Sequence, residues 1–241
     1  MQNRYAGDIG DYVKLALLRA VSEGRRVGVA WWLCPDGGPA GDGRHVAYLD
    51  APATWRHLDA SLFDALQHIV SSNQRSVATL EQLQLLPDAV YCSDTIPTGM
   101  TPAECRSTRL TWFARCRAVL QECDLVFLDP DNGLEPSKFS TGSKRAAKAV
   151  SMAELCALRE PGRALIVYHH QTRRPGGHLA ELDHWGDRLR KVGFARVGAL
   201  RATAYSVRAF FLLDADDALQ DHARQFAHRW RGRVSWHEAL G

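Results

Sequence analysis

The chain has 241 residues, of which 46% are hydrophobic and 24% are charged, and these proportions exclude a disordered or collagen-like protein. A chain of this length can bury one sizeable core, and no linker interrupts it, so we expect a single domain over residues 1–241. The formal net charge of +3 at pH 7 permits an anionic partner, but a dedicated nucleic-acid-binding protein has a larger basic excess.

Cysteine spacing and apolar runs indicate the compartment. The six cysteines form no C-x-x-C pair, which excludes zinc-ribbon spacing. The longest apolar runs, such as 164–168 and 210–213, are far shorter than the ~20 residues that span a bilayer. No secretory signal is recognised, so we expect a cytoplasmic protein with reduced thiols and no membrane partner.

Hydrophobic periodicity predicts helices and strands that alternate along the chain. In the first half of the chain we expect a helix over residues 9–21, a strand over 27–33, helices over 63–70 and 79–86, a strand over 90–93 and a helix over 109–122. In the second half we expect a strand over 124–128, a helix over 144–158, a strand over 163–168, a helix over 178–192, strands over 195–200 and 207–213, and a last helix over 216–230. This alternation favours an α/β fold, a Rossmann-like three-layer sandwich with a mainly parallel sheet and a terminal antiparallel hairpin.

An acidic segment, DPDNGLE at 129–135, follows the apolar strand 124–128. Open α/β sheets bind ligands at the carboxyl ends of their strands, so this segment lies where a site is expected. Its carboxylates could instead cap the following segment. Because like charges crowded at a sheet edge are costly, we favour the catalytic interpretation, with Asp129, Asp131 and Asn132 as the candidate residues.

Two further segments carry candidate residues. The first is YAGDIGDYVK at 5–14, in which Asp8 can cap the helix 9–21 and Lys14 can reach a carboxylate or phosphate or remain at the surface. The second is YHHQTRR at 168–174, at the end of an apolar strand. Its histidines could act as bases, metal ligands or stacking surfaces, and its arginines could hold phosphate or lie in a solvated loop.

With these motifs the chain resembles the bacterial 23S ribosomal RNA adenine-amino methyltransferases. That family opens with Ala-Gly-Asn-x-x-Asp-(Val/Tyr)-x-Lys before a helix, which is similar to residues 6–14 here. Its catalytic Asp-Pro-Pro-Tyr motif follows an apolar strand, and residues 129–132 occupy the matching place. A seven-stranded sheet whose last strand is antiparallel is also typical of class I methyltransferases. Asn132 stands where the family has its aromatic residue.

The resemblance implies a methyltransferase that uses S-adenosylmethionine and modifies an amine of a nucleic acid, either RNA or DNA. In the family the aspartate and the following carbonyl accept hydrogen bonds from the target amine, and the aromatic residue stacks on the flipped base. It therefore implies that Asp129 orients the amine, with Asp131 and Asn132 beside it. The cofactor side would comprise Gly7, Asp8 and Lys14, and the substrate side Tyr5, Tyr168, His169, His170, Arg173 and Arg174.

An alternative keeps the fold and changes the chemistry. Asp129, Asp131 and Glu135, with His169 or His170, offer ligands for Mg²⁺ or Mn²⁺, which could activate water in a phosphodiesterase or nuclease. A third hypothesis is a binding module without activity. Both enzymatic hypotheses require the segments 5–14, 129–135 and 168–170 to open into one crevice.

Overall fold

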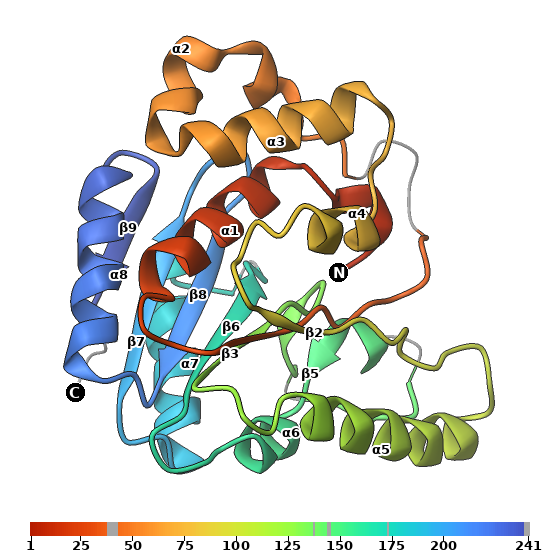
Figure 1. Cartoon of the computed structure of the whole chain (residues 1–241). Coiled ribbons are helices and arrows are strands. Elements are labelled where there is room, and N and C mark those ends of the chain that lie inside the picture. Colours follow the sequence, from red (N-terminus) through yellow and green to blue (C-terminus); the bar gives the residue numbers. More distant parts are fainter. Residues whose placement is uncertain (38–42, 137, 144–145, 173, 239–241) are drawn as a thin grey trace.

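The computed structural model describes residues 1–37, 43–136, 138–143, 146–172 and 174–238. A seven-stranded sheet lies between two layers of helices, as expected for an α/β fold (Figure 1). The strand order is β2-β1-β3-β6-β8-β7-β9. The strands are β1 (Val27–Ala30), β2 (Val90–Cys92), β3 (Leu125–Leu128), β6 (Ala164–His170), β7 (Val197–Ala202), β8 (Arg208–Leu213) and β9 (Val234–His237).

The strand directions divide the sheet into two parts. β2, β1, β3 and β6 pair in parallel, whereas β8 runs antiparallel to both of its neighbours, β6 and β7. β9 pairs antiparallel with β7. The chain passes from β1 to β2 on one side and then to β3 on the other, so the strand order reverses at β1. Such a switch point leaves a crevice at the carboxyl ends of the strands, where ligands bind.

Helices cover both faces of the sheet. One face carries α1 (Ile9–Val21), α3 (Ala60–Ser71), α4 (Val77–Gln82) and α8 (Asp217–Arg229), and the other carries α5 (Pro102–Val119), α6 (Met152–Ala157) and α7 (Gly177–Lys191) (Figure 1). A short helix, α2 (Pro52–Trp55), lies before α3. Strand β3 shows why the core strands are apolar throughout: Phe127 packs into the α1 layer and Val126 into the α5 layer.

The sequence predicted most of these elements, and the expected α/β class with a mostly parallel core is confirmed. Helix α1 has the expected bounds, because Asp8 accepts a hydrogen bond from the Asp11 amide and thereby caps it. The strand expected over 27–33 ends at Ala30, and Trp32 has a left-handed φ of 49° that does not suit a strand. The expected hairpin forms from β7 and β8, but it is not terminal, since β9 follows it.

The helix expected over 144–158 is wrong in its first half. Residues 144–145 lie outside the described part, a turn of 3-10 helix spans Ala146–Lys148, and Ala149–Val150 forms strand β5, which pairs with β4 (Gly133–Leu134). Ser151 then caps α6 in a capping box with Glu154, so the helix begins only at residue 152. The pairing of β5 with the acidic segment 129–135 overrides its local helix pattern.

Two other expectations concern cysteines and membranes. All six cysteines are free thiols. None of the described helices is long and apolar enough to span a bilayer.

Candidate functional site

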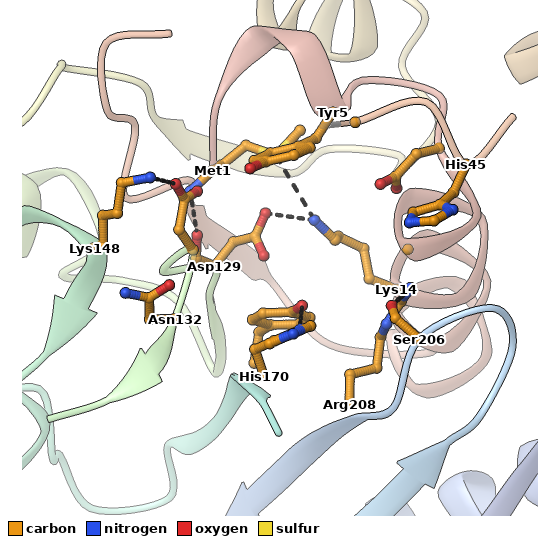
Figure 2. Close-up of a pocket in the computed structure, with 15 residues that line it drawn as sticks. Met1, Tyr5, Lys14, His45, Asp129, Asn132, Lys148, His170, Ser206 and Arg208 are labelled. Atoms are coloured by element: carbon orange, nitrogen blue, oxygen red, sulfur yellow. Dashed lines mark hydrogen bonds and ion pairs between the residues drawn. The ribbon is translucent and has the colours of Figure 1, made fainter. Parts of the chain in front are cut away.

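A cavity of about 440 Å³ opens at the carboxyl ends of β3 and β6 (Figure 2). The three segments that the sequence singled out all line it, with Tyr5, Asp8 and Lys14 from the first, Asp129, Asp131 and Asn132 from the second, and Tyr168 and His170 from the third. The expected juxtaposition of these segments is therefore found. Ligand pockets commonly have volumes of roughly 300–1,000 Å³, so the cavity can hold a small molecule or one nucleotide.

Lys14 and Asp129 form a buried ion pair in the wall of this cavity. The Lys14 Nζ atom lies 2.5 Å from Asp129 Oδ2 and 2.9 Å from Asp11 Oδ1. Burial alone would lower the pKa of Lys14, but the charges of Asp11 and Asp129 outweigh it and raise that pKa. Burial raises the pKa of Asp11 to about 6. Lys14 is thus a buried, permanently charged lysine and not a surface residue.

The turn before α1 places Lys14. Gly7 has a left-handed φ of 81°, and its amide donates to Asp11 Oδ2 at 2.9 Å. Its carbonyl accepts a hydrogen bond from the Tyr48 hydroxyl. Gly7 itself does not line the cavity, so its role is to shape the start of the helix, and its expected contact with a cofactor is not supported.

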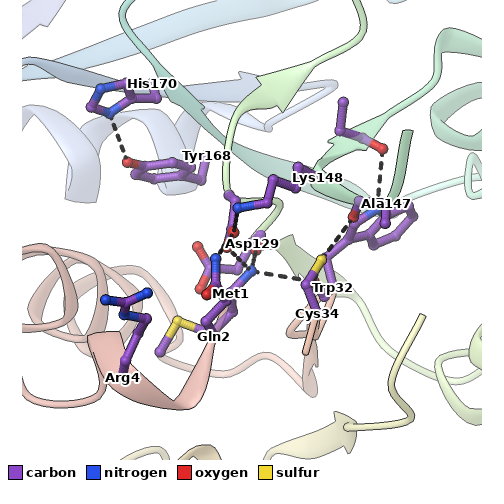
Figure 3. A network of polar contacts seen from close by, with 12 residues as sticks. Met1, Gln2, Arg4, Trp32, Cys34, Asp129, Ala147, Lys148, Tyr168 and His170 are labelled. Atoms are coloured by element: carbon purple, nitrogen blue, oxygen red, sulfur yellow. Dashed lines mark hydrogen bonds and ion pairs between the residues drawn. The ribbon is translucent and has the colours of Figure 1, made fainter. Parts of the chain in front are cut away.

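Asp131 is surrounded by donors. Its Oδ1 atom lies 2.7 Å from the α-amino group of Met1, and its Oδ2 atom lies 2.5 Å from Gln2 Nε2 and 3.1 Å from Lys148 Nζ (Figure 3). Burial would raise the pKa of Asp131, but the Met1 amine, Gln2 and Lys148 together lower it. The same amine donates to the carbonyl of Asp129 at 2.7 Å. These contacts hold the acidic segment rigid.

Tyr168 and His170 form an aromatic wall. The Tyr168 hydroxyl lies 3.3 Å from His170 Nδ1, and the Lys14 ammonium lies 5.7 Å from the centre of the Tyr168 ring. Burial raises the pKa of Tyr168 to about 12, so the phenol stays protonated at neutral pH. The wall can stack against a planar group.

His169 points away from its neighbour His170, because successive residues of a strand face opposite sides of the sheet. Its ring is fully buried on the α7 side, with Nε2 3.3 Å from Glu181 Oε1 and Nδ1 accepting from the Leu134 amide. Burial lowers the pKa of His169. The expected contact of His169 with substrate is therefore wrong, and its role is to tie β6 to β4.

Two further candidates, Arg174 and Glu135, do not line the cavity. Arg174 is exposed and does not line it, and Arg173 lies outside the described residues. The Glu135 carboxylate lies 3.6 Å from Arg188 Nη2, and burial raises its pKa.

The metal hypothesis does not fit these positions. No group of three or more His, Cys, Asp or Glu side chains within the described ranges could hold a metal ion. The Asp129 and Asp131 carboxylates already contact ammonium groups, and His169 and Glu135 face other partners. A divalent cation needs several oxygen ligands that converge on one point, and the described side chains do not form such a set.

Sequence reasoning missed several lining residues, namely Met1, Gly10, Gly43, His45, Lys148, Ser206 and Arg208. Only Arg208 carried a usable signal, since it is the one charged residue of the apolar strand β8, RAFFLL. The rest belong to loops or helix ends whose approach depends on the fold.

Comparison with known proteins adds no family, since neither the models of known families nor the curated proteins contain a match to this chain.

Proposed function

We propose that the chain is a methyltransferase that uses S-adenosylmethionine and acts on an amine of a nucleic acid. The observation that carries the proposal is that Asp129 and Asn132, Tyr5 and Lys14, and Tyr168 line one cavity at the carboxyl edge of the sheet. These residues come from three distant segments, and the family resemblance depends on two of them, residues 6–14 and 129–132. The antiparallel strand β8 beside β6 and β7 also agrees with a class I methyltransferase sheet.

Two adjoining cavities suit an acceptor and a cofactor together. Lys148, whose side chain is 36% exposed, lies in the wall of the cavity at the carboxyl edge of the sheet and also in that of an adjoining cavity of about 410 Å³. The adjoining cavity has apolar walls that include Ile96, Pro97 and Met100, which suit an adenosine ring. In this proposal Lys148 and Asn132 hold the amino-acid end of S-adenosylmethionine, which supplies an electrophilic methyl group when bound.

The residues of the chain would align the acceptor. Asp129 orients the amine by accepting a hydrogen bond from it, which supplies the proximity that methyl transfer requires. Lys14 is a positioning residue, because its ion pair holds the Asp129 carboxylate in one orientation. Methylation of the amine forms an N–CH₃ bond and releases one proton, which would pass to solvent, because the pKa of Lys14 is raised and this residue is already protonated. Tyr168 provides the wall against which a base stacks.

Thermal unfolding with added ligand tests the proposal first. S-adenosylmethionine and S-adenosylhomocysteine should stabilise the protein by about 2.7 kcal/mol at 100 times the dissociation constant, and Mg²⁺ or Mn²⁺ should not. Transfer of a labelled methyl group to RNA or DNA is the second measurement. Asp129→Asn should abolish transfer and retain cofactor binding, whereas the exposed control Asp94→Asn should change neither. Stabilisation by Mn²⁺ alone would contradict the methyltransferase proposal.

A further inference from the structure

Arg208 is a buried arginine that forms no ion pair with any of the described residues. It is 3% exposed, and it is the first residue of β8. Its Nη2 atom donates to the Ser206 hydroxyl, but its Nε and Nη1 atoms are buried without any hydrogen-bond partner in the described part of the chain. A buried charge without a partner is costly, so its retention in a cavity wall indicates a missing anion.

The surroundings of Arg208 leave room for its guanidinium group. Figure 2 shows the side chain rising from β8 toward Ser206, on the side of the cavity where His45 lies. A Cβ atom at Gly10 would lie only 2.6 Å from Arg208 Nη1, so the absence of a side chain at position 10 admits the guanidinium group. Asp8 faces the same gap, but its Oδ1 atom already accepts the Asp11 amide as the cap of α1.

The position of Arg208 relates it to the acceptor site. In the antiparallel pairing of β6 with β8, Arg208 stands opposite His170, beside the wall formed by Tyr168. The charge of Arg208 acts on the Tyr168 phenol, lowering its pKa against the larger effect of burial. The first turn of α1, with Gly10, adds the positive end of a 13-residue helix to the same side.

A phosphate group matches this set of donors. The Nε and Nη1 hydrogens are unused, and Nη2 keeps one hydrogen beside one of them, so one edge of the guanidinium group can make a bidentate contact to a phosphate. The amino-acid end of the cofactor has been assigned to Lys148, so the Arg208 side remains for the acceptor. We propose that Arg208 holds a phosphate group of the nucleic-acid substrate, next to the base that stacks on Tyr168. This inference rests on the proposed function and adds a phosphate subsite to it.

Calorimetric titration with nucleosides and their 5′-monophosphates tests the subsite. Wild-type protein should bind the monophosphate of its preferred nucleoside at least ~10-fold more tightly than the nucleoside, because a charge-assisted bidentate contact contributes on that order. In Arg208→Met the preference should fall to within about twofold. Arg208→Lys should show an intermediate preference for the monophosphate, since lysine keeps the positive charge but cannot make the bidentate contact. The matched control is Arg201→Met, on the neighbouring strand β7, where Arg201 donates to His178.

Gly10→Ala provides a second variant that does not remove the arginine. The added Cβ must displace the guanidinium group and also shift the Asp8 Oδ1 atom that caps α1. Alanine favours the helix, so the fold should persist while the monophosphate preference falls. An unchanged preference in both Arg208→Met and Gly10→Ala, or no preference in the wild type, would overturn the phosphate subsite. So would a loss of S-adenosylhomocysteine binding in Arg208→Met with the preference intact, since the anion would then be the cofactor carboxylate.

The two proposals fail in different measurements. A wild-type protein that binds monophosphates through Arg208 but neither binds S-adenosylhomocysteine nor transfers a methyl group would refute the proposed methyltransferase and support the phosphate subsite. A protein that transfers methyl groups without an Arg208-dependent phosphate preference would support the proposed methyltransferase and refute the phosphate subsite.

Discussion

Two buried arginines on opposite faces of the sheet have contrasting surroundings. Arg109, on α5, donates from Nε and Nη2 to Glu154 at 2.6 and 2.9 Å and also to the carbonyls of Ala146 and Ala149. Arg208 is equally buried, at 3% exposure, but the Ser206 hydroxyl is its one hydrogen-bond partner within the described residues. Arg109 holds the fold together, whereas Arg208 lines a cavity and keeps two buried donors unused. Burial of a charge therefore does not by itself distinguish a structural residue from a binding residue; the state of its partners does.

The largest effect on stability is expected at Arg109, the arginine whose donors all have partners. Arg109→Met would leave the Glu154 carboxylate and two carbonyls without their donor, and breaking a buried pair in this way costs about 3–5 kcal/mol. Urea denaturation measures this loss of free energy of unfolding. Arg115→Met is the control, because Arg115 lies on the same helix with an exposed ion pair, and it should lose less than about 1 kcal/mol. Equal losses in the two variants would contradict a structural role for Arg109.

Lys14→Met should lower the free energy of unfolding by about 3–4 kcal/mol at pH 7, nearly as much as Arg109→Met, because it leaves Asp11 and Asp129 buried without a cation. The pKa of Asp11 is already about 6, so this carboxyl can take up a proton, and the loss should shrink as the pH falls below 6. Denaturation at pH 7 and pH 5 measures the difference. A loss that grows toward pH 5 would show that the ion pair is not the source of the effect.

His178 is a buried side chain that is neutral at pH 7, in contrast to the two arginines. Its Nδ1 atom accepts from Arg201 Nε, and burial together with the Arg201 charge lowers the pKa of His178 to about 4. Because this folded-state pKa lies below the unfolded value of 6.5, the stabilisation is present above pH 6.5 and is lost as the pH falls toward 4. It amounts to about 3 kcal/mol at most. His178→Gln, which can still accept from Arg201, should show a shallower pH dependence of unfolding in this window, and an unchanged slope would exclude His178 as its source.

The smallest effect on stability is expected at Arg208, the arginine with unused donors. Arg208→Met removes a charge that forms no ion pair in the described structure, so the free energy of unfolding should stay within about 1 kcal/mol of the wild type or increase. The measurement is the same urea titration, without ligand. A loss as large as that of Arg109→Met would remove the contrast between the two arginines.

Local patterns in the sequence were sufficient for most of the elements and for the position of the acidic segment. The helical spacing after Asp8 and the cap itself determine α1, because both act within one turn. The apolar run before Asp129 determines β3 and places this carboxylate at the sheet edge. The approach of 5–14, 129–135 and 168–170 to one another could be expected from the rule that ligands bind where parallel strands end.

The tertiary structure alone decided which side chains share the cavity and which have partners. His169 and His170 are adjacent in sequence, but the pleat sends only His170 to the cavity, and the register of β6 decides which one. Lys14 and Asp129 are 115 residues apart, and no local pattern reveals that they pair. The unused donors of Arg208 are likewise visible only after every neighbour is in place. Secondary structure depends on short-range contacts. Whether a buried charged side chain has a partner depends on contacts between residues that are distant in the sequence.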